Sequence, residues 1–378
     1  MHSVTPFSRT DTSVLGRWWW TVDRWMLTAV LLLMLLGAAL ALAASPAAAE
    51  RIGLDSFHFA RQQLLFLPVA LIVMLGVSLL SRSGIQRIAT AGTVLGIVLL
   101  ALTLIVGLEL NGARRWLALG GFNLQPSEFV KPCLAVFMAA VLARPRDEQL
   151  RYGILLASIP VVLAALLLVL QPDIGMATTV AAVWFVQMFV AGMPLVLAVL
   201  GAAATAGGLV YAYHNLTHVK ARIDQFIDPT TGDTYQVDTS LRAFEVGGLF
   251  GRGPGEGVVK NVLPDAHTDF IFAVAAEEFG VIACIVIVGL FGFVVFRGFA
   301  RVMRGGDLFS LIAVAGLLAQ FGFQALINMG VAIRLLPAKG MTLPFLSYGG
   351  SSTMATAIGL GMVLALTRER RSDEGYVL

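Results

Sequence analysis

The chain has 378 residues, of which 58% are hydrophobic and only 13% are charged, and its mean hydropathy is +0.84. Soluble domains carry about 25% charged residues, so this chain has too little polar surface to cover a water-exposed globule. The net charge is only +3 and the basic residues are scattered between apolar segments, which argues against nucleic-acid binding. The composition therefore predicts a polytopic membrane protein.

The first apolar segment resembles a secretory signal peptide, because Arg24 precedes it and an alanine-rich stretch at 40–49 ends it. However, the apolar run from Trp25 to Ala44 is long enough to cross about 30 Å of hydrocarbon. Further apolar segments follow it to the end of the chain. We interpret it as a retained first transmembrane helix.

The apolar segments predict an all-α integral membrane protein with ten transmembrane helices. In chain order they are 25–44, 63–80, 88–108, 127–143, 153–170, 174–191, 194–213, 269–296, 308–328 and 347–367. The eighth is long enough to begin outside the hydrocarbon or to tilt. We expect one transmembrane domain at 25–367, flanked by tails at 1–24 and 368–378. Residues 214–268 are expected to form one long loop without a domain of its own.

The distribution of arginine and lysine predicts the orientation. With ten crossings, one side holds fourteen arginines, whereas the short loops of the other side hold six arginines and lysines. Both termini are therefore expected in the cytoplasm, and the 214–268 loop is expected on the outer side.

Cysteine and histidine give no sign of a metal cluster or a disulfide framework. Cys133 and Cys284 both fall in apolar segments, where packing is the expected role, no Cys-x-x-Cys spacing occurs, and the chain has only five histidines. The glycine-rich run at 247–257 resembles a phosphate-binding loop, but no strand precedes it and no Gly-Lys-Ser/Thr follows it.

Polar clusters stand at the N-termini of spans 4, 6, 8 and 10, which this topology places on the outer side. The clusters are Gln125-Pro126-Ser127-Glu128, Gln171-Pro172-Asp173, His267-Thr268-Asp269, and Ser347-Tyr348-Gly349-Gly350-Ser351. Part of this pattern is ordinary helix capping: Pro126 and Pro172 suit a first turn, and Ser347 or Thr268 can cap. Four helix N-termini on one face also form a site suited to an anionic group such as phosphate.

Ionisable residues inside the membrane are costly and are usually paired or functional. Glu128 and Lys131 share a helix face, so they are expected either to pair or to face a carboxylate or phosphate. Glu277 and the adjacent Glu278 need partners, which arginine or lysine from neighbouring helices can supply.

Two further polar features have open interpretations. Arg114 and Trp116 are either a membrane-interface anchor or part of a pyrophosphate site. The stripe of Gln320, Gln324 and Asn328 is best explained by interhelical hydrogen bonds.

Five stretches carry a resemblance to a known family. They are NGARRWLALGGFNLQPSEFVKP at 111–132, QPDIG at 171–175, GLFGRGPGEG at 248–257, LPDAHTDFIFAVAAEEFG at 263–280 and LPAKGMTLPFLSYGGSS at 336–352. Together they resemble the SEDS family (shape, elongation, division and sporulation). The KGMTLP run at 339–344 is more similar to the division branch than to the elongation branch.

The resemblance implies a peptidoglycan glycosyltransferase that polymerises lipid II at the outer face of the cytoplasmic membrane, at the division septum. The family's essential aspartate falls on Asp269, for which we expect the role of general base in an inverting displacement. Substrate binding or support is expected from Lys131, Arg114, Trp116, Gln125, Ser127, Glu128, Gln171, Asp173, His267, Thr268, Glu277, Lys339, Ser347, Tyr348, Gly349, Gly350 and Ser351. No cofactor is certain, and a divalent cation (magnesium or manganese) would assist the departing pyrophosphate. The implied partners are a class B penicillin-binding protein, other division proteins and membrane lipids.

Three other functions fit parts of the sequence. A flippase for lipid-linked precursors would also use polar helix ends, but its site should lie near the middle of the bilayer. An elongation-type polymerase is the nearest alternative enzyme. A silent scaffold for division proteins would tolerate replacement of Asp269.

Overall fold

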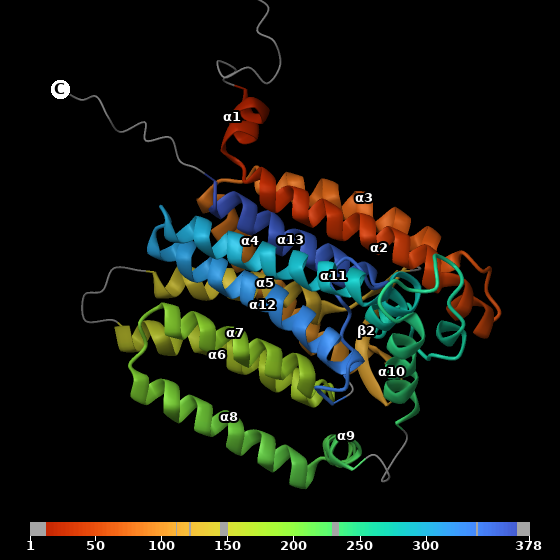
Figure 1. Cartoon of the computed structure of the whole chain (residues 1–378). Helices are drawn as coiled ribbons and strands as arrows, with labels where there is room; N and C mark the ends of the chain where they lie inside the picture. The colour runs from red at the N-terminus through yellow and green to blue at the C-terminus, as the bar shows by residue number, and fades with distance from the viewer. Residues whose placement is uncertain are drawn as a thin grey trace, which may run out of the picture.

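The computed structural model describes residues 13–110, 112–120, 122–143, 150–228, 234–337 and 339–368. Helices dominate it (Figure 1). They are α1 (Val14–Thr21), α2 (Arg24–Arg51), α3 (His58–Ser78), α4 (Arg82–Val106), α5 (Pro126–Leu142), α6 (Leu150–Leu170), α7 (Ile174–Val190), α8 (Leu195–Asn215), α9 (Thr217–Ile227), α10 (Tyr235–Gly247), α11 (Ile271–Met303), α12 (Leu308–Ala332) and α13 (Gly350–Leu366). A 3₁₀ turn, η2, spans Val259–Asn261. The strands are β1 (Leu108–Leu110), β2 (Ala113–Leu119) and β3 (Phe122–Leu124).

Each of the ten predicted spans coincides with a helix in the part of the chain that the structure describes. Six of the described helices contain a stretch long and apolar enough to cross a membrane on their own: α2, α3, α4, α6, α11 and α12. The apolar helices α7 and α13 are shorter, with 17 residues each. The protein is therefore a multi-pass membrane protein, and the count of ten crossings stays a prediction.

The long helices form a layered bundle (Figure 1). Helices α2 and α3 lie side by side along one edge, α4, α5, α11, α12 and α13 fill the middle, and α6 and α7 lie on the other side. Helix α12 is the most enclosed of the long helices, with 67% of its apolar window buried. Helix α8 lies farthest out and contacts mainly α9.

The predicted all-α fold class is confirmed, and the connection between α4 and α5 adds one small sheet. Strand β1 pairs antiparallel with β2, and β2 pairs antiparallel with β3. The sequence carries the matching turn signals, Asn-Gly at 111–112 and Gly-Gly at 120–121. Such dipeptides between short apolar runs favour hairpins.

The 214–268 connection is also more ordered than a loop, because it contains α9, α10 and η2. Helix α10 packs against α11 and buries Ala243 and Gly247. The hydroxyl of Ser240 on α10 donates to the carbonyl oxygen of Ala332 at 2.7 Å. The segment is therefore tied to the bundle through packing and hydrogen bonding.

Helix α11 is interrupted at Gly280, where φ is 82° and ψ is 175°. At this break the carbonyl oxygens of Glu277 and Glu278 accept hydrogen bonds from the N–H groups of Arg252 and Gly253, at 2.9 and 3.0 Å. A buried carbonyl without a partner is costly. The glycine-rich segment 247–257 thus supplies the hydrogen bonds that the interrupted helix lacks.

Candidate active site

The predicted polar clusters meet at the end of the bundle that carries the sheet. The N–H of Gln125, just before α5, donates to the hydroxyl of Ser351 in α13 at 3.1 Å. The segments before α11 and α13 are also joined, because Ser347 donates to the carbonyl oxygen of Thr268 at 2.5 Å and the N–H of Tyr348 to that of His267 at 2.9 Å. Prediction and structure agree that these clusters share one end.

Asp269 lies half-buried in the segment that leads into α11. Its carbonyl oxygen accepts a hydrogen bond from the side-chain amide of Asn328 at 2.8 Å, and the same amide donates to Met341 at 2.6 Å. An ideal Cβ placed on Gly340 would lie 3.1 Å from Oδ2 of Asp269. The carboxylate therefore lies against the loop between α12 and α13, and Asn328 fixes both segments from α12.

Lys339 connects this loop to the first turn of α7. Its side chain crosses Gly175 so closely that a Cβ on Gly175 would lie 1.5 Å from Cε and 2.5 Å from Nζ. Only glycine leaves room for this crossing. Lys339 is the chain neighbour of Gly340, so its side chain joins the loop that contacts the Asp269 carboxylate to the positive end of α7.

Asp173 is the N-cap of α7. It accepts a hydrogen bond from the N–H of Met176 at 3.1 Å, and its Oδ2 lies 3.8 Å from Nε of Arg115. Arg115 also donates to the carbonyl oxygens of Gln171 and Pro172. This arrangement places a guanidinium group beside the α7 N-terminus.

The structure brings Arg115 to the site, whereas the sequence pointed to Arg114. Arg114 is exposed and pairs with Glu109 on β1 at 3.1 Å. Both arginines lie on β2, and successive side chains of a strand face opposite ways. The sequence signal that distinguishes the two arginines is the pair of turn dipeptides at 111–112 and 120–121, which predict a strand between them with alternating faces. Trp116, two residues after Arg114, is half-buried and opposes Leu108 on β1.

Glu128 and Lys131 form the predicted pair, deep in the bundle. Their charged atoms are 3.0 Å apart and their side chains are 4% and 3% exposed. Nζ of Lys131 also lies 3.2 Å from Oε1 of Gln324. Lys131 therefore holds a carboxylate and an amide inside the protein, whereas Lys339 and Arg115 are less buried.

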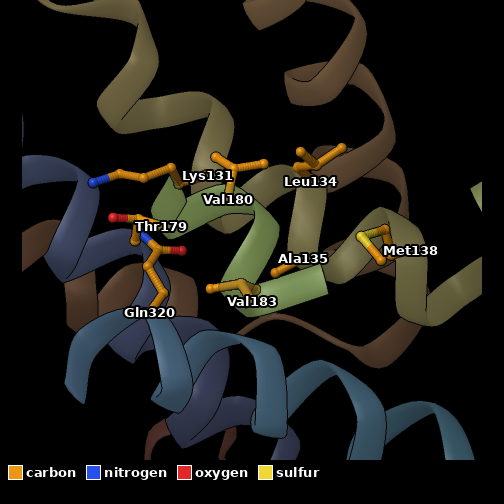
Figure 2. A pocket seen from close by; sticks show the side chains of 8 residues that line it. All are labelled: Lys131, Leu134, Ala135, Met138, Thr179, Val180, Val183 and Gln320. Atoms are coloured by element: carbon orange, nitrogen blue, oxygen red, sulfur yellow. The ribbon is translucent and has the colours of Figure 1, made fainter. Parts of the chain in front are cut away.

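Lys131 also borders a small cavity, shown in Figure 2, which Thr179, Gln320 and apolar side chains line as well. Its volume of about 10 Å³ is close to the minimum for one water molecule. Oε1 of Gln320 is buried without a protein partner among the described residues.

The predicted polar stripe of α12 makes interhelical hydrogen bonds, as expected. Nε2 of Gln324 donates to the carbonyl oxygen of Thr342 at 3.0 Å and to the hydroxyl of Ser352 at 3.2 Å. Gln324 therefore links α12 to the first turn of α13 and to the loop before it.

Glu277 was expected to support substrate, yet its contacts are to the protein backbone. Its carboxylate accepts hydrogen bonds from the N–H groups of Val258, Val259 and Lys260 at 2.6, 2.6 and 2.9 Å. The neighbouring Glu278 pairs with the ammonium of Lys260. Lys260 is thus the basic partner expected for this pair of glutamates. Through these contacts both glutamates hold the segment that precedes Asp269 against α11.

An aromatic wall borders the site on the side of α3. The ring of His267 stacks on Phe59 with centroids 4.2 Å apart, and Tyr348 meets Phe59 edge-on at 4.9 Å. The hydroxyl of Tyr348 donates to Gln62. His267 is largely enclosed and not a surface loop residue, and burial lowers its pKa to about 4, although the nearby Asp265 acts to raise it. Sequence reasoning missed Phe59.

Several capping predictions are wrong. Pro172 precedes the cap of α7, and α11 begins at Ile271, beyond Thr268. Ser347 also lies before α13, whose cap is Gly349, and its hydroxyl accepts a hydrogen bond from the N–H of Leu343 at 2.7 Å.

Three other predicted residues, Gln171, Ser127 and Gly350, make packing or hydrogen-bond contacts with the surrounding helices. Gln171 is buried and donates to the carbonyl oxygen of Leu100 at 2.8 Å. Ser127 is buried in the first turn of α5. Gly350 opens α13, and a Cβ there would lie 3.0 Å from the ring of Phe66.

Comparison with known proteins identifies the class. The FtsW/RodA/SpoVE model, described as cell cycle protein, matches residues 23–372. A relative from Caulobacter vibrioides, named probable peptidoglycan glycosyltransferase FtsW, is 45% identical over 377 residues, covering 99% of this chain and 96% of the relative. One from Saccharophagus degradans with the same name is 40% identical and covers 87% of this chain and 88% of its own. The chain therefore belongs to the FtsW/RodA/SpoVE family, the SEDS proteins.

Solved structures agree with this assignment. A chain from a peptidoglycan synthase complex, described as coordinating polymerization and crosslinking, has a TM-score of 0.73 and 30% identity. The rod shape determining protein RodA of Thermus thermophilus has a TM-score of 0.68 and 31% identity. In both comparisons the match covers 92% of this chain and 97% of the other. The SEDS resemblance inferred from the motifs is confirmed.

Proposed function

We propose that this protein polymerises lipid II into glycan strands, with Asp269 as the general base. Its enzyme class, peptidoglycan glycosyltransferase, is the one named for relatives that match it over nearly the whole chain. The observation that carries the residue assignment is the position of the Asp269 carboxylate against Gly340, next to Lys339 and the α7 N-terminus. A carboxylate close to fixed positive charge suits transfer of a sugar from a pyrophosphate.

The reaction joins an α-linked glycosyl pyrophosphate to a sugar hydroxyl as a β-1,4 bond, so the anomeric carbon is inverted in one displacement. Asp269 would accept the proton of the acceptor hydroxyl while the oxygen of that hydroxyl attacks the anomeric carbon. The bond to the pyrophosphate breaks and its electron pair leaves with the phosphate oxygen. Lys339, Arg115 and the N-terminus of α7 would stabilise the charge that develops there.

A divalent cation fits this site only with help from the substrate. Among the described residues no group of three or more His, Cys, Asp or Glu side chains can hold a metal ion. Magnesium is commonly bound by one or two carboxylates together with substrate phosphates. Asp269 would supply such a carboxylate, and the ion would add positive charge at the leaving group.

The partners and the location are also part of the proposal. The similarity to a chain of a peptidoglycan synthase complex supports pairing with a class B penicillin-binding protein that cross-links the new strands. The FtsW relatives support a place among the division proteins at the septum. The arginine distribution supports cytoplasmic termini and an outward-facing site.

The decisive experiment follows glycan chains formed from purified lipid II by this protein with its cognate transpeptidase and added magnesium. Asp269→Asn preserves shape but removes the base, so we expect polymerisation to fall by roughly 10²–10⁴-fold. Asp265→Asn, an exposed aspartate of the same segment, is the matched control and should stay active.

Binding of the transpeptidase and the apparent melting temperature show that each variant is folded. Equal amounts of polymer from wild type and Asp269→Asn would exclude Asp269 as the general base. No polymer from folded wild-type complex would favour transport or scaffolding.

A further inference from the structure

A second concave site lies at the other end of the bundle from Asp269. It is a groove of about 1160 Å³ between α4 and the ends of α5 and α12. Helix α4 is about 37 Å long, and its last residue, Val106, leads into the sheet beside the candidate active site. The first turn of α4, at the groove, is therefore one helix length away from that end. We define this feature as the α4 groove. The proposed glycosyltransferase function assigns no role to it.

The head of the α4 groove is basic. Arg82 is held in place by an ion pair with Asp307, and its guanidinium group lies 4.7 Å from the ring centroid of Phe309. Arg87 is exposed and has no hydrogen bond or ion pair with any other described residue. Gln86 adds a polar side chain between the arginines. This end therefore offers hydrogen-bond donors and net positive charge.

The rest of the α4 groove is apolar. Its wall along α4 continues through Val94, Leu95 and Val98, and its floor includes the small side chain of Ala140 on α5. From Arg87 to Val98 the helix rises about 16 Å, which is close to half of a hydrocarbon core of about 30 Å. The groove is thus about as long as one leaflet is thick, and its charged end would lie at the membrane surface.

We propose that the α4 groove binds an anionic phospholipid of the leaflet opposite the candidate active site. Its phosphate would contact Arg87 and the exposed edge of Arg82, while one acyl chain would lie along Val94 and Val98. Basic pockets between transmembrane helices at the cytoplasmic side recognise anionic lipid headgroups. An acidic peptide would satisfy the arginines but not the apolar wall at hydrocarbon depth. Free phosphate would leave that wall empty.

The test measures lipid binding to the purified full-length protein by native mass spectrometry, with phosphatidylglycerol and phosphatidylcholine of identical acyl chains. Wild type should retain phosphatidylglycerol in preference to phosphatidylcholine. Arg87→Gln should weaken phosphatidylglycerol binding about fivefold, the factor that corresponds to ~1 kcal/mol for one arginine near a membrane surface. Arg304→Gln, another exposed arginine, is the matched control and should bind as wild type does.

A second variant tests the apolar part of the groove. Ala140→Phe fills the floor and should reduce phosphatidylglycerol binding, whereas Gly289→Phe, at a position with open space around it, should not. A photoreactive phosphatidylglycerol added to wild-type protein should label residues 82–98 or 140–143, and this measurement does not depend on any variant folding.

Three outcomes would overturn the proposal: equal binding of both lipids to wild type, equal loss with the Arg87 and Arg304 variants, or labelling confined to other helices. Each would leave only nonspecific annular lipid.

Discussion

Lys131 and Glu128 illustrate at the residue scale how burial changes the role of a charge. Both side chains are at most 4% exposed, and the ammonium group also contacts Gln324. Removing two charges from water is costly, and their mutual attraction offsets the cost only while both remain. The hydrogen bond from Lys131 to Gln324 therefore ties this pair on α5 to α12.

Replacing Lys131 by Met should destabilise the protein strongly, because Glu128 then remains buried without its counter-ion. The loss expected for breaking a buried pair is about 3–5 kcal/mol. The double variant Glu128→Gln with Lys131→Met should recover much of the apparent melting temperature in detergent. If the double variant is no more stable than Lys131→Met alone, the unpaired carboxylate of Glu128 is not the cause of the destabilisation.

His267 makes stability depend on pH. Burial lowers its pKa to about 4 in the folded protein, against 6.5 for an ordinary histidine. As the pH falls below about 6.5 the unfolded chain binds a proton that the folded protein does not, so folded stability declines towards pH 4.

His267→Phe, which keeps a ring on Phe59, should therefore show a smaller drop in melting temperature between about pH 7 and pH 5 than wild type. His214→Gln removes an exposed histidine and should leave the drop unchanged. An identical drop in wild type and His267→Phe would exclude His267 as its source.

At the scale of elements, the interruption of α11 shapes the approach to Asp269. The break at Gly280 opens backbone groups that the 247–257 segment occupies, and Glu277 and Glu278 fasten the next residues through Val258 and Lys260. The chain between these anchors and α11 carries Asp269. The anchored segment thus limits where the carboxylate can lie.

Gly280→Ala should disrupt this arrangement. Its φ of 82° is strained for alanine, and the added Cβ would lie 2.3 Å from the carbonyl oxygen of Leu249. We expect a loss of at least about 1–3 kcal/mol from strain alone, together with reduced polymerisation. Gly289→Ala lies in regular helix with open space and should keep or slightly raise stability. Similar melting temperatures for the two variants would refute the anchoring role.

For the whole molecule, the accessibility of single cysteines to a thiol reagent tests the predicted topology. In a variant whose buried Cys133 and Cys284 are replaced by alanine, Asp265→Cys should react with an impermeant thiol reagent on intact spheroplasts. Arg304→Cys should react only after the membrane is opened, because the arginine distribution predicts a cytoplasmic position for it. Labelling of both sites, or of Arg304→Cys alone, in intact spheroplasts would contradict the predicted orientation.

The sequence by itself determined the membrane class, the helices and the family. Long apolar runs must be buried in lipid or protein, and a helix satisfies its own backbone there, so each predicted span is a helix. The pairing of Glu128 with Lys131 was equally local, since residues three apart share a helix face. The capping predictions at Pro172, Thr268 and Ser347 failed because tertiary contacts moved the helix starts.

Only the tertiary structure decided which charged groups from different segments of the chain meet. Successive side chains of β2 face opposite ways, and the packing of the sheet against the segment before α7 decided that Arg115 and not Arg114 reaches the α7 N-terminus. Lys339 crosses Gly175, and Lys260 reaches Glu278, through contacts between segments far apart in the chain. Such contacts depend on how helices and loops pack against one another, and no local pattern of residue types encodes that packing.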